Sequence, residues 1–370
     1  MEPIQKPGIV NQFPDVFRGL GKLKDNYVID LKEDATPYAL TTPRRVPIPL
    51  LPKVKEELQR MEKLGVITRI EEPTDWCSGM VVVPKQNGKV RICVDLTKLN
   101  ESVRRERHIL PSVEQTLAQI GGAKHFSKLN TNSGYWQIEL APESAKLTTF
   151  ITPFGRFCFN RLPFGIMSAP EHFQRRMMEI LESVICLVED ILVSGKTQEE
   201  HDQRLKAVLS RLQKDGLTLG LEMCEINKPS VRFLGQLINE TGVRPDPDKV
   251  RAIQEMKPPT TVSELRRFLG MINQQSKFSF HQTKPLRDLL SLKNQWNWGK
   301  DQQQAFESLQ RSLSFSEVLA MYNASHETVL SADASSYGLG AVLRQRQPDR
   351  SLRPIAYASR ALTETEQRYA

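Results

Sequence analysis

The 370-residue chain carries 51 Lys and Arg residues against 43 Asp and Glu, a formal net charge of +8, and 39% of its residues are hydrophobic. This composition indicates a globular protein with room for several compact units of ~100–200 residues and a sizeable core. The basic balance favours a polyanionic partner over an acidic substrate, although an ordinary basic soluble protein has the same balance.

Five cysteines are scattered along the chain without a CxxC pair, so neither a zinc site nor a disulfide framework is indicated, and reducing conditions fit best. They are Cys77, Cys93, Cys158, Cys186 and Cys224. The stretch MEPIQKPGIV has no charged start followed by an apolar core, and no apolar run approaches the ~18 residues of a membrane span. We expect a soluble intracellular protein, cytoplasmic or nuclear, with no membrane partner and no targeting signal.

A helix and a β-hairpin are predicted in the first hundred residues. The helix is expected to start at Pro52 and to end at Gly65. Its apolar stripe consists of Val54, Leu58, Met61 and Leu64. The stretch GMVVVPKQNGKVRICVDLTKLN then predicts strand, turn and strand, because Asn87-Gly88 lies between two β-branched runs.

The predicted hairpin opens a basic segment, 85–107. It contains seven Lys or Arg residues against Asp95, Glu101 and Glu106. Such an excess of positive charge could bind phosphates. A solvated charged surface is the alternative, and the segment by itself does not decide between the two.

Residues 125–140, HFSKLNTNSGYWQIEL, predict a strand followed by a Ser-Gly turn that carries Tyr135 and Trp136. A buried aromatic turn is the simpler interpretation of this pair. After LPFG, Ser168 is expected to cap a helix. The apolar positions of that helix are Phe173, Met177, Ile180 and Leu181.

The stretch CLVEDILVSG, residues 186–195, places Glu189 and Asp190 between two short apolar runs. One interpretation is a hairpin tip, since Asp favours turns. The other is a tight hairpin that holds two carboxylates rigidly for a divalent metal. Thr197 and Glu200 then predict a capping box for a helix that ends near Gly216.

Helical patterns dominate the segment from about 241 to 300, where they flank Pro258-Pro259. Thr261 and Glu264 form a capping box there, and Arg266 and Arg267 are expected to face outward. The later stretch TVLSADASSYGLGAVLRQ predicts strand, glycine-bearing turn and strand. Strands and helices thus mix without a strict βαβ rhythm, which predicts the α+β class.

Six stretches occur in an order that identifies a family. They are VPKQNGKVRICVDLTKLN, FSKLNTNSGYWQI, TTFITPFGRFCFNRLPFGIMSAPEHFQ, EDILVSG, RFLGQLI and LRRFLGMIN. Together they resemble the reverse transcriptase of a gypsy-type LTR retroelement Pol polyprotein. DASSYGLGAVL and RPIAYASRALTETEQRYA are similar to the start of the tethered RNase H domain, so the resemblance covers nearly the whole chain.

This resemblance implies a right-hand polymerase fold followed by a truncated RNase H-like fragment. Residues 1–75 would be an N-terminal extension with the first fingers helix, and 76–240 the fingers and palm. Residues 241–300 would be the helical thumb, and 301–370 the tether and the truncated RNase H-like domain. RNase H activity is not expected from half a domain, whose sheet would keep an unpaired edge and be loosely attached.

The resemblance also implies roles for individual residues. The metal-binding carboxylate positions fall on Asn130, Glu189 and Asp190, with Asp333 as the acidic position of the RNase H part. Arg91 and Lys85 would bind the incoming triphosphate, and Tyr135 would exclude a ribose 2′ hydroxyl. The nucleotide and template pocket would be lined by Leu162, Pro163, Phe164 and Gly165. The primer grip would be formed by Phe233, Leu234 and Gly235.

Two of the three polymerase carboxylate positions depart from the family pattern, which has Asp at 130 and at 189. Asn130 lacks the negative charge, and Glu189 is longer by about 1.5 Å, one C–C bond. The two-metal Mg²⁺ site that the family uses would therefore be weakened, with Mn²⁺ as a less demanding substitute. We predict impaired or absent polymerisation.

The expected partners are an RNA or DNA template with its primer and deoxynucleoside triphosphates. Other Pol or Gag products of the element are further candidates. The first hypothesis is a reverse transcriptase by lineage, an RNA-directed DNA polymerase with altered catalytic carboxylates. The alternative is a non-catalytic nucleic-acid-binding remnant or pseudogene product.

Overall fold

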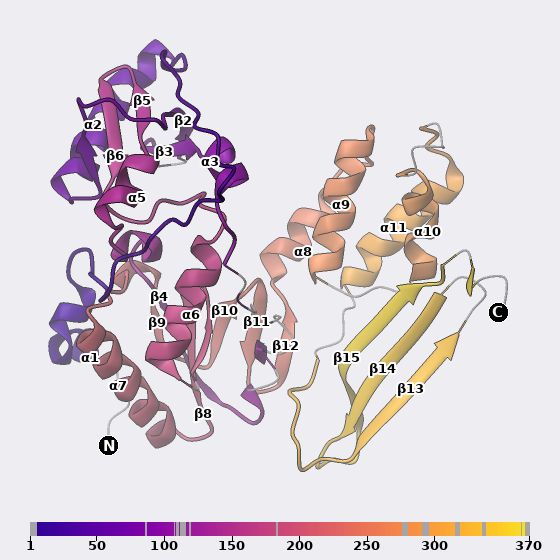
Figure 1. The fold of residues 1–370 in the computed structure, drawn as a ribbon. Helices are drawn as coiled ribbons and strands as arrows, with labels where there is room; N and C mark the ends of the chain where they lie inside the picture. The colour runs from indigo at the N-terminus through magenta and orange to yellow at the C-terminus, as the bar shows by residue number, and fades with distance from the viewer. Residues whose placement is uncertain are drawn as a thin grey trace. The chain divides into compact units, whose positions relative to one another are not determined.

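The computed structural model describes residues 6–85, 87–106, 108, 111, 116–117, 120–182, 184–275, 280–290, 296–314, 319–334, 338–363 and 365–366. The chain divides into two compact units, which are described separately (Figure 1). The first comprises 1–112, 127–193 and 202–226, and the second 113–126, 194–201 and 227–370. Within the described residues, none of the helices combines the length and hydropathy that a membrane span requires.

One sheet of the first unit contains the predicted hairpin. Its strands are β1 (Ile67–Arg69), β2 (Ser78–Pro84), β3 (Val90–Asp95), β5 (Phe150–Thr152) and β6 (Gly155–Phe159), in the order β1-β6-β5-β2-β3. The hairpin β2–β3 is confirmed, with Pro84 opposite Val90 and a positive φ of 77° at Gly88, where glycine is favoured. The Lys85 amide donates to the Lys89 carbonyl at 2.8 Å and closes the five-residue loop.

A second sheet has the strand order β7-β8-β4-β9. Its strands are β4 (His125–Asn130), β7 (Ile185–Leu187), β8 (Asp190–Gly195) and β9 (Glu225–Lys228). The main helices of this unit are α2 (Leu51–Lys63), α6 (Ala169–Leu181) and α7 (Gln198–Asp215). Shorter helices are α1 (Lys6–Gln12), α3 (Thr97–Ser102), α5 (Pro142–Leu147), and the 3-10 turns η1 (Pro14–Phe17), η2 (Ile48–Leu50), η4 (Gly134–Gln137) and η5 (Leu221–Met223).

The predicted apolar stripe of α6 is confirmed, since Phe173, Met177, Ile180 and Leu181 are all buried in one core with β4 and β8. Two other expectations were wrong. Leu64 is 40% exposed, because α2 ends at Lys63 and the chain turns at Gly65. Ser168 is at the N-cap position of α6, but its side chain makes no capping bond: its hydroxyl instead accepts from the Glu106 amide at 3.2 Å.

The capping box of α7 is confirmed in a shifted form. The Thr197 hydroxyl accepts from the Glu200 amide at 3.2 Å, as predicted. The Glu200 carboxylate reaches one residue further back and accepts from the Lys196 amide at 2.6 Å. A positive φ of 74° at Gly216 follows the end of the helix.

The second unit holds two three-stranded sheets and a helical cluster. The strands are β10 (Ser230–Phe233), β11 (Gln236–Asn239) and β12 (Gly242–Pro245), then β13 (Thr328–Ala334), β14 (Gly338–Arg346) and β15 (Leu352–Ala361). The helices are α8 (Pro247–Gln254), α9 (Val262–Gln275), α10 (Phe280–Asp288) and α11 (Lys300–Ser314). Their buried apolar side chains include Phe268 and Phe306, whose rings lie 4.5 Å apart.

The helical segment starts later than the predicted residue 241. Asn239 accepts from the amides of Thr241 and Gly242, which turns the chain so that β12 pairs with β11. The first helix then begins after Asp246, whose carboxylate accepts from the Asp248 amide. The capping box of α9 is confirmed, with the Thr261 hydroxyl accepting from the Glu264 amide at 3.2 Å.

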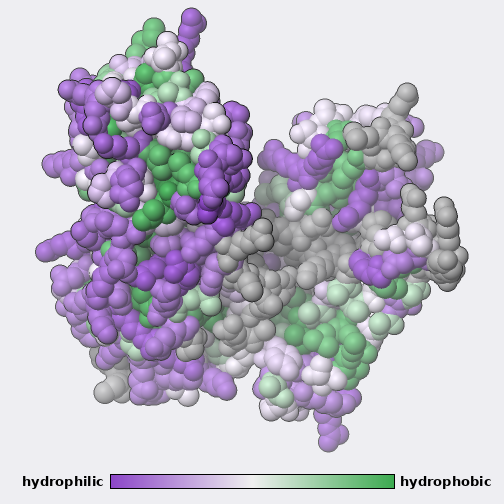
Figure 2. Space-filling model, in the orientation of Figure 1, coloured by the Kyte–Doolittle hydropathy of each residue, from purple (hydrophilic) through white to green (hydrophobic). Residues whose placement is uncertain are grey.

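The C-terminal sheet exposes apolar side chains on the face seen in Figure 2. Leu330 is 67% exposed and Leu352 is 43% exposed. The two predicted strands are confirmed as β13 and β14, and β15 adds a third. The predicted turn between β13 and β14, at 335–337, lies outside the described residues.

Candidate active site

The acidic hairpin is held rigidly by α6. Leu187 pairs with Asp190, so the two-residue tip is Val188-Glu189, and Asp190 is the first residue of β8. Val188 has a φ of 51°, which costs a β-branched residue about 1–3 kcal/mol. The side chain of Gln174 stabilises this turn: its Oε1 accepts from the Val188 amide at 2.7 Å, and its Nε2 donates to the Cys186 carbonyl at 3.1 Å.

The structure brings together the three positions predicted to bind metal. Asn130 ends β4, the neighbour of β8, and its Nδ2 donates to Asp190 Oδ1 at 2.9 Å. Lys128, two residues earlier on the same strand, has its Nζ 3.7 Å from the same oxygen. Asp190 is therefore already paired with protein donors.

Glu189 points to the turn after β4. Its Oε1 accepts from the Gly134 amide at 2.8 Å. Burial raises the pKa of the Glu189 carboxyl, and the negative charge of Asp190 raises it further. The hydrogen bond from Gly134 and the positive charge of Arg91 lower this pKa, but they do not cancel the rise. The Glu189 carboxylate therefore stabilises the turn after β4.

The donor set does not fit the two-metal site that the family resemblance implies. Two Mg²⁺ ions need several anionic oxygen ligands. Asn130 is neutral and directs an N–H group at Asp190. Across the described ranges, no three or more His, Cys, Asp or Glu residues gather closely enough to hold a metal ion.

Tyr135 and part of LPFG form an aromatic cluster beside the acidic pair. The Tyr135 ring lies 4.9 Å from Phe164 and 5.5 Å from Phe173, and it is 9% exposed. Burial and the charges of Glu189 and Glu171 raise the pKa of Tyr135 to about 12, so its hydroxyl stays protonated at neutral pH.

Only two residues of LPFG are exposed enough to contact a nucleotide. Phe164 is 47% exposed, and Gly165 is exposed with a φ of 103° that favours glycine. Leu162 and Pro163 are buried, so they support this segment from within. Asn100 fixes the segment, since its side chain donates to the Gly165 carbonyl at 2.7 Å and accepts from the Met167 amide at 2.8 Å.

The basic segment splits into two groups. Lys98 pairs with Glu101, Arg104 with Glu33, and Arg105 with Glu171. Lys85, Lys89 and Arg91 are exposed on the hairpin, and no carboxylate of the described residues lies within 4 Å of them. Arg107 lies outside the described residues. The hairpin cations are therefore the ones available to phosphates.

The predicted primer grip lies in the second unit. Phe233 is fully buried, and Leu234 and Gly235 form a two-residue turn between β10 and β11 with φ values of 51° and 79°. Of the three predicted primer-grip residues, Leu234 and Gly235 are therefore partly exposed, and Phe233 is not accessible. Arg266 and Arg267 are exposed on α9, as predicted. This exposure fits both the position near a duplex that the family resemblance implies and a solvated helix face.

Asp333 is exposed on β13, and its Oδ1 accepts from the next amide, Ala334, at 3.0 Å. The described residues place no metal-binding cluster of acidic side chains around it. Its predicted role therefore stays a prediction.

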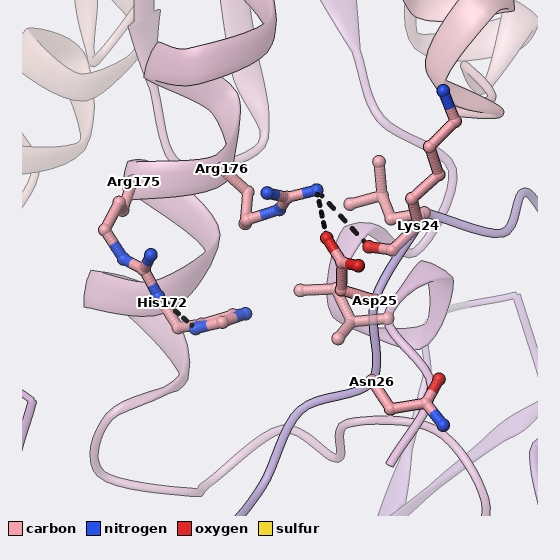
Figure 3. A pocket seen from close by; sticks show the side chains of 8 residues that line it. Lys24, Asp25, Asn26, His172, Arg175 and Arg176 are labelled. Atoms are coloured by element: carbon pink, nitrogen blue, oxygen red, sulfur yellow. Dashed lines mark hydrogen bonds and ion pairs between the residues drawn. The ribbon is translucent and has the colours of Figure 1, made fainter. Parts of the chain in front are cut away.

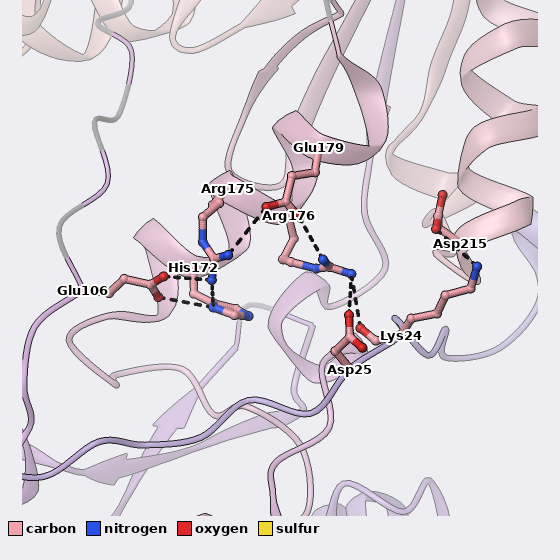
Figure 4. A network of polar contacts seen from close by, with 8 residues as sticks. All are labelled: Lys24, Asp25, Glu106, His172, Arg175, Arg176, Glu179 and Asp215. Carbon is pink, nitrogen blue, oxygen red and sulfur yellow. Dashed lines mark hydrogen bonds and ion pairs between the residues drawn. The ribbon is translucent and has the colours of Figure 1, made fainter.

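A cavity of about 210 Å³ in the first unit is a second candidate site (Figure 3). It is lined by Leu23, Lys24, Asp25, Asn26, Ile138, His172, Arg175 and Arg176. Its cations are paired: Arg176 with Asp25 and Glu179, and Lys24 with Asp215 (Figure 4). With Arg175, which pairs with Glu106 and Glu179, the three cations face four carboxylates, so the cavity does not attract an anion. The network instead ties α6 to the N-terminal segment.

His172 gives this network a pH dependence. Its Nδ1 lies 3.3 Å from Glu106 and 3.1 Å from Arg175 Nη2, and its ring packs at a tilt of 59° against Tyr27, with the ring centroids 4.5 Å apart. Burial lowers the pKa of His172 below its ordinary 6.5; Glu106 opposes this, and Arg175 and Arg176 add to it.

We predict that acid destabilises the first unit through His172. Below pH 6.5 the unfolded chain binds a proton that the folded one resists, so the free energy of unfolding falls as pH falls. One group contributes at most about 1.4 kcal/mol per pH unit. The free energy of unfolding, measured with denaturant between pH 7.5 and about 5, should fall less steeply with falling pH for His172→Gln than for the unmodified protein. Equal slopes for the two proteins would contradict the prediction.

Sequence reasoning missed Lys128, Gln174 and Gly134. Lys128 could have been found, because residues two apart on a strand share a face and Lys128 precedes Asn130 by two. Gln174 and Gly134 carried no such signal, since their bonds join segments 14 and 55 residues apart.

Family models match most of the chain. Residues 83–238 match the reverse transcriptase (RNA-dependent DNA polymerase) model, and residues 298–370 match an RNase H-like domain found in reverse transcriptase. A retrovirus-related Pol polyprotein from transposon opus of Drosophila melanogaster is 35% identical over 357 residues, 90% of this chain and 35% of that protein. The transposon Tf2-3 polyprotein of Schizosaccharomyces pombe is 33% identical over 337 residues, 88% of this chain and 25% of that protein.

Solved structures share the fold. A foamy viral protease-reverse transcriptase in complex with an RNA/DNA hybrid has a TM-score of 0.83 at 22% identity, over 97% of this chain and 50% of that one. The same kind of protein in complex with dsDNA has a TM-score of 0.84, over 97% of this chain and 77% of that one. The chain spans about a quarter to a third of the length of the curated relatives above.

Proposed function

Because this chain belongs to the reverse transcriptase lineage of retrotransposon Pol polyproteins, we propose that it binds primed templates but transfers nucleotides poorly or not at all. The observation that carries the proposal is the contact between Asn130 Nδ2 and Asp190 Oδ1, where the family resemblance places two carboxylates. The proposed template is RNA or DNA with a primer, and deoxynucleoside triphosphates are the proposed substrates. Residues 76–240 would act as fingers and palm, and the helices α8, α9 and α10 would act as the thumb.

The neighbouring site residues support nucleotide binding more than chemistry. Arg91 is exposed on β3, and its positive charge lowers the pKa of the Glu189 carboxyl, which supports a role beside the acidic pair. Tyr135 and Phe164 are in edge contact beside the same pair. A triphosphate held by Arg91 and Lys85 could therefore still bind, while its activation would lack the anions that gather Mg²⁺ or Mn²⁺.

A non-catalytic nucleic-acid-binding remnant is the second candidate, and the same Asn130 contact favours it. Primer extension and primer-template binding, measured on the same purified protein, separate the two. Binding with slow extension supports an impaired polymerase, and binding without extension supports the remnant. Extension as fast as that of the double variant Asn130→Asp, Glu189→Asp would contradict both.

We also predict that the 370-residue protein does not cleave RNA in an RNA-DNA hybrid. Cleavage of this kind needs a metal pair held by several carboxylates. Asp333 is exposed, and its oxygen is engaged by the Ala334 amide. Degradation of a labelled hybrid, followed by gel electrophoresis, should match a protein-free control. Rapid degradation that is lost in Asp333→Asn would overturn this prediction.

A further inference from the structure

We infer that the acidic pair of this chain has become a structural clasp that needs no metal: Glu189 fastens the hairpin tip to Gly134, and Asp190 is neutralised by Asn130 and Lys128. The inference deepens the proposed function and rests on it, because it starts from an impaired polymerase site. We call these five residues the clasp.

The Glu189 half of the clasp depends on the length of the side chain and on the absence of one at Gly134. A Cβ on Gly134 would lie 2.6 Å from Thr131 Oγ1 and 3.1 Å from Glu189 Cγ, so the stem of Glu189 packs against the bare Cα. The carboxylate then reaches the Gly134 amide at 2.8 Å. An aspartate is shorter by about 1.5 Å and would lose this bond.

The main chain strengthens this junction. The Thr131 amide donates to the Glu189 carbonyl at 3.0 Å, so Glu189 is bonded to the turn after β4 through both its backbone and its side chain. The next residue after Gly134 is Tyr135, whose ring packs between Phe164 and Phe173. The clasp therefore holds the turn that positions Tyr135.

In the Asp190 half of the clasp, the positive charge that faces the carboxylate comes from the protein. Lys128 and Asn130 lie on the same side of β4, since side chains alternate along a strand. Both direct nitrogen atoms at Asp190 Oδ1, at 3.7 and 2.9 Å. Both carboxylates are therefore bonded to protein groups without any metal ion, Glu189 to the Gly134 amide and Asp190 to Lys128 and Asn130.

The clasp predicts an unusual response to metal. Where carboxylates face one another, a bound cation stabilises the folded protein by mass action. In this chain a cation would have to displace Lys128 and Asn130 from Asp190. The stability of the unmodified protein should therefore be independent of Mg²⁺.

Thermal unfolding of the full chain tests the clasp, with midpoints measured in EDTA and in about 10 mM MgCl₂. The unmodified midpoint should be the same in both. Glu189→Asp should lower it by about 2–4 °C in both, because one hydrogen bond to a charged group is lost. Glu189→Gln is the matched control: it removes the charge but keeps an oxygen that accepts from Gly134, so it should lower the midpoint by less than Glu189→Asp does.

Asn130→Asp supplies the complementary result. It places two carboxylates in contact, so its midpoint should fall in EDTA and recover in MgCl₂. A Mg²⁺-dependent rise for the unmodified protein that is absent from Glu189→Gln would make Glu189 a working ligand and overturn the clasp. Equal losses for Glu189→Asp and Glu189→Gln would also overturn it. Primer extension is measured separately. A protein that does not extend primers but is stabilised by Mg²⁺ would contradict the clasp and leave the proposed function standing.

Discussion

The double variant Asn130→Asp, Glu189→Asp is expected to extend a primer on an RNA template on the order of 10²-fold faster than the unmodified protein, because a misplacement near 1 Å can cost that much in rate. Restoring the charge at Asn130 alone should give a trace of extension, since Glu189 still directs its carboxylate to Gly134. Glu189→Asp alone restores the shorter side chain at position 189, but position 130 still lacks its negative charge. Residues that act as a unit are strongly non-additive, so the double variant should exceed the sum of the two single variants.

This gain in activity should come with a loss in stability. Glu189→Asp breaks the bond to Gly134, and Asn130→Asp removes the donor to Asp190. Extension should therefore be measured at a temperature where all four proteins are folded, in Mg²⁺ and in Mn²⁺. Mn²⁺ should favour residual activity in the unmodified protein. If the unmodified protein already extends primers as well as the double variant, the chain is not an impaired polymerase.

The elements around the site were predictable where local pattern decides. Asn87-Gly88 between β-branched runs marked the β2–β3 hairpin, and the helical spacing from Phe173 to Leu181 marked α6. The motif order also placed Asn130, Glu189 and Asp190 together, and the adjacent strands β4 and β8 confirm this. The first two signals are local patterns of residue type, which the sequence shows directly. The third came from the family resemblance, because Asn130 and Asp190 are 60 residues apart.

The electrostatics of the site were not predictable in the same way. Whether Glu189 faces a metal or an amide depends on where Gly134 comes to lie, 55 residues away. Ser168 resembled a helix cap, but the Glu106 amide, 62 residues away, occupies its hydroxyl. The same holds for the basic segment: its excess charge was visible, whereas pairing of Arg105 with Glu171 appears only in three dimensions.

Binding to a primer-template duplex is expected to weaken on the order of 10³-fold between about 50 and about 200 mM salt, as for proteins that neutralise several phosphates. Lys85, Lys89 and Arg91 are the cations of the basic segment that the described carboxylates leave available. Replacing all three with Gln should reduce the slope of log affinity against log salt by about 2–3, at roughly 0.9 per phosphate contact.

A charge-matched triple variant separates phosphate contact from net charge. Lys98, Arg104 and Lys146 lie 3.0, 3.4 and 2.8 Å from Glu101, Glu33 and Glu72. Replacing these three with Gln removes the same formal charge, but their charges are already neutralised, so the salt slope should stay close to that of the unmodified protein. Fluorescence anisotropy with one labelled duplex measures all three proteins. If both triple variants lower the slope equally, general charge attracts the duplex and the hairpin is not its phosphate grip; if neither does, the duplex is bound elsewhere on the chain.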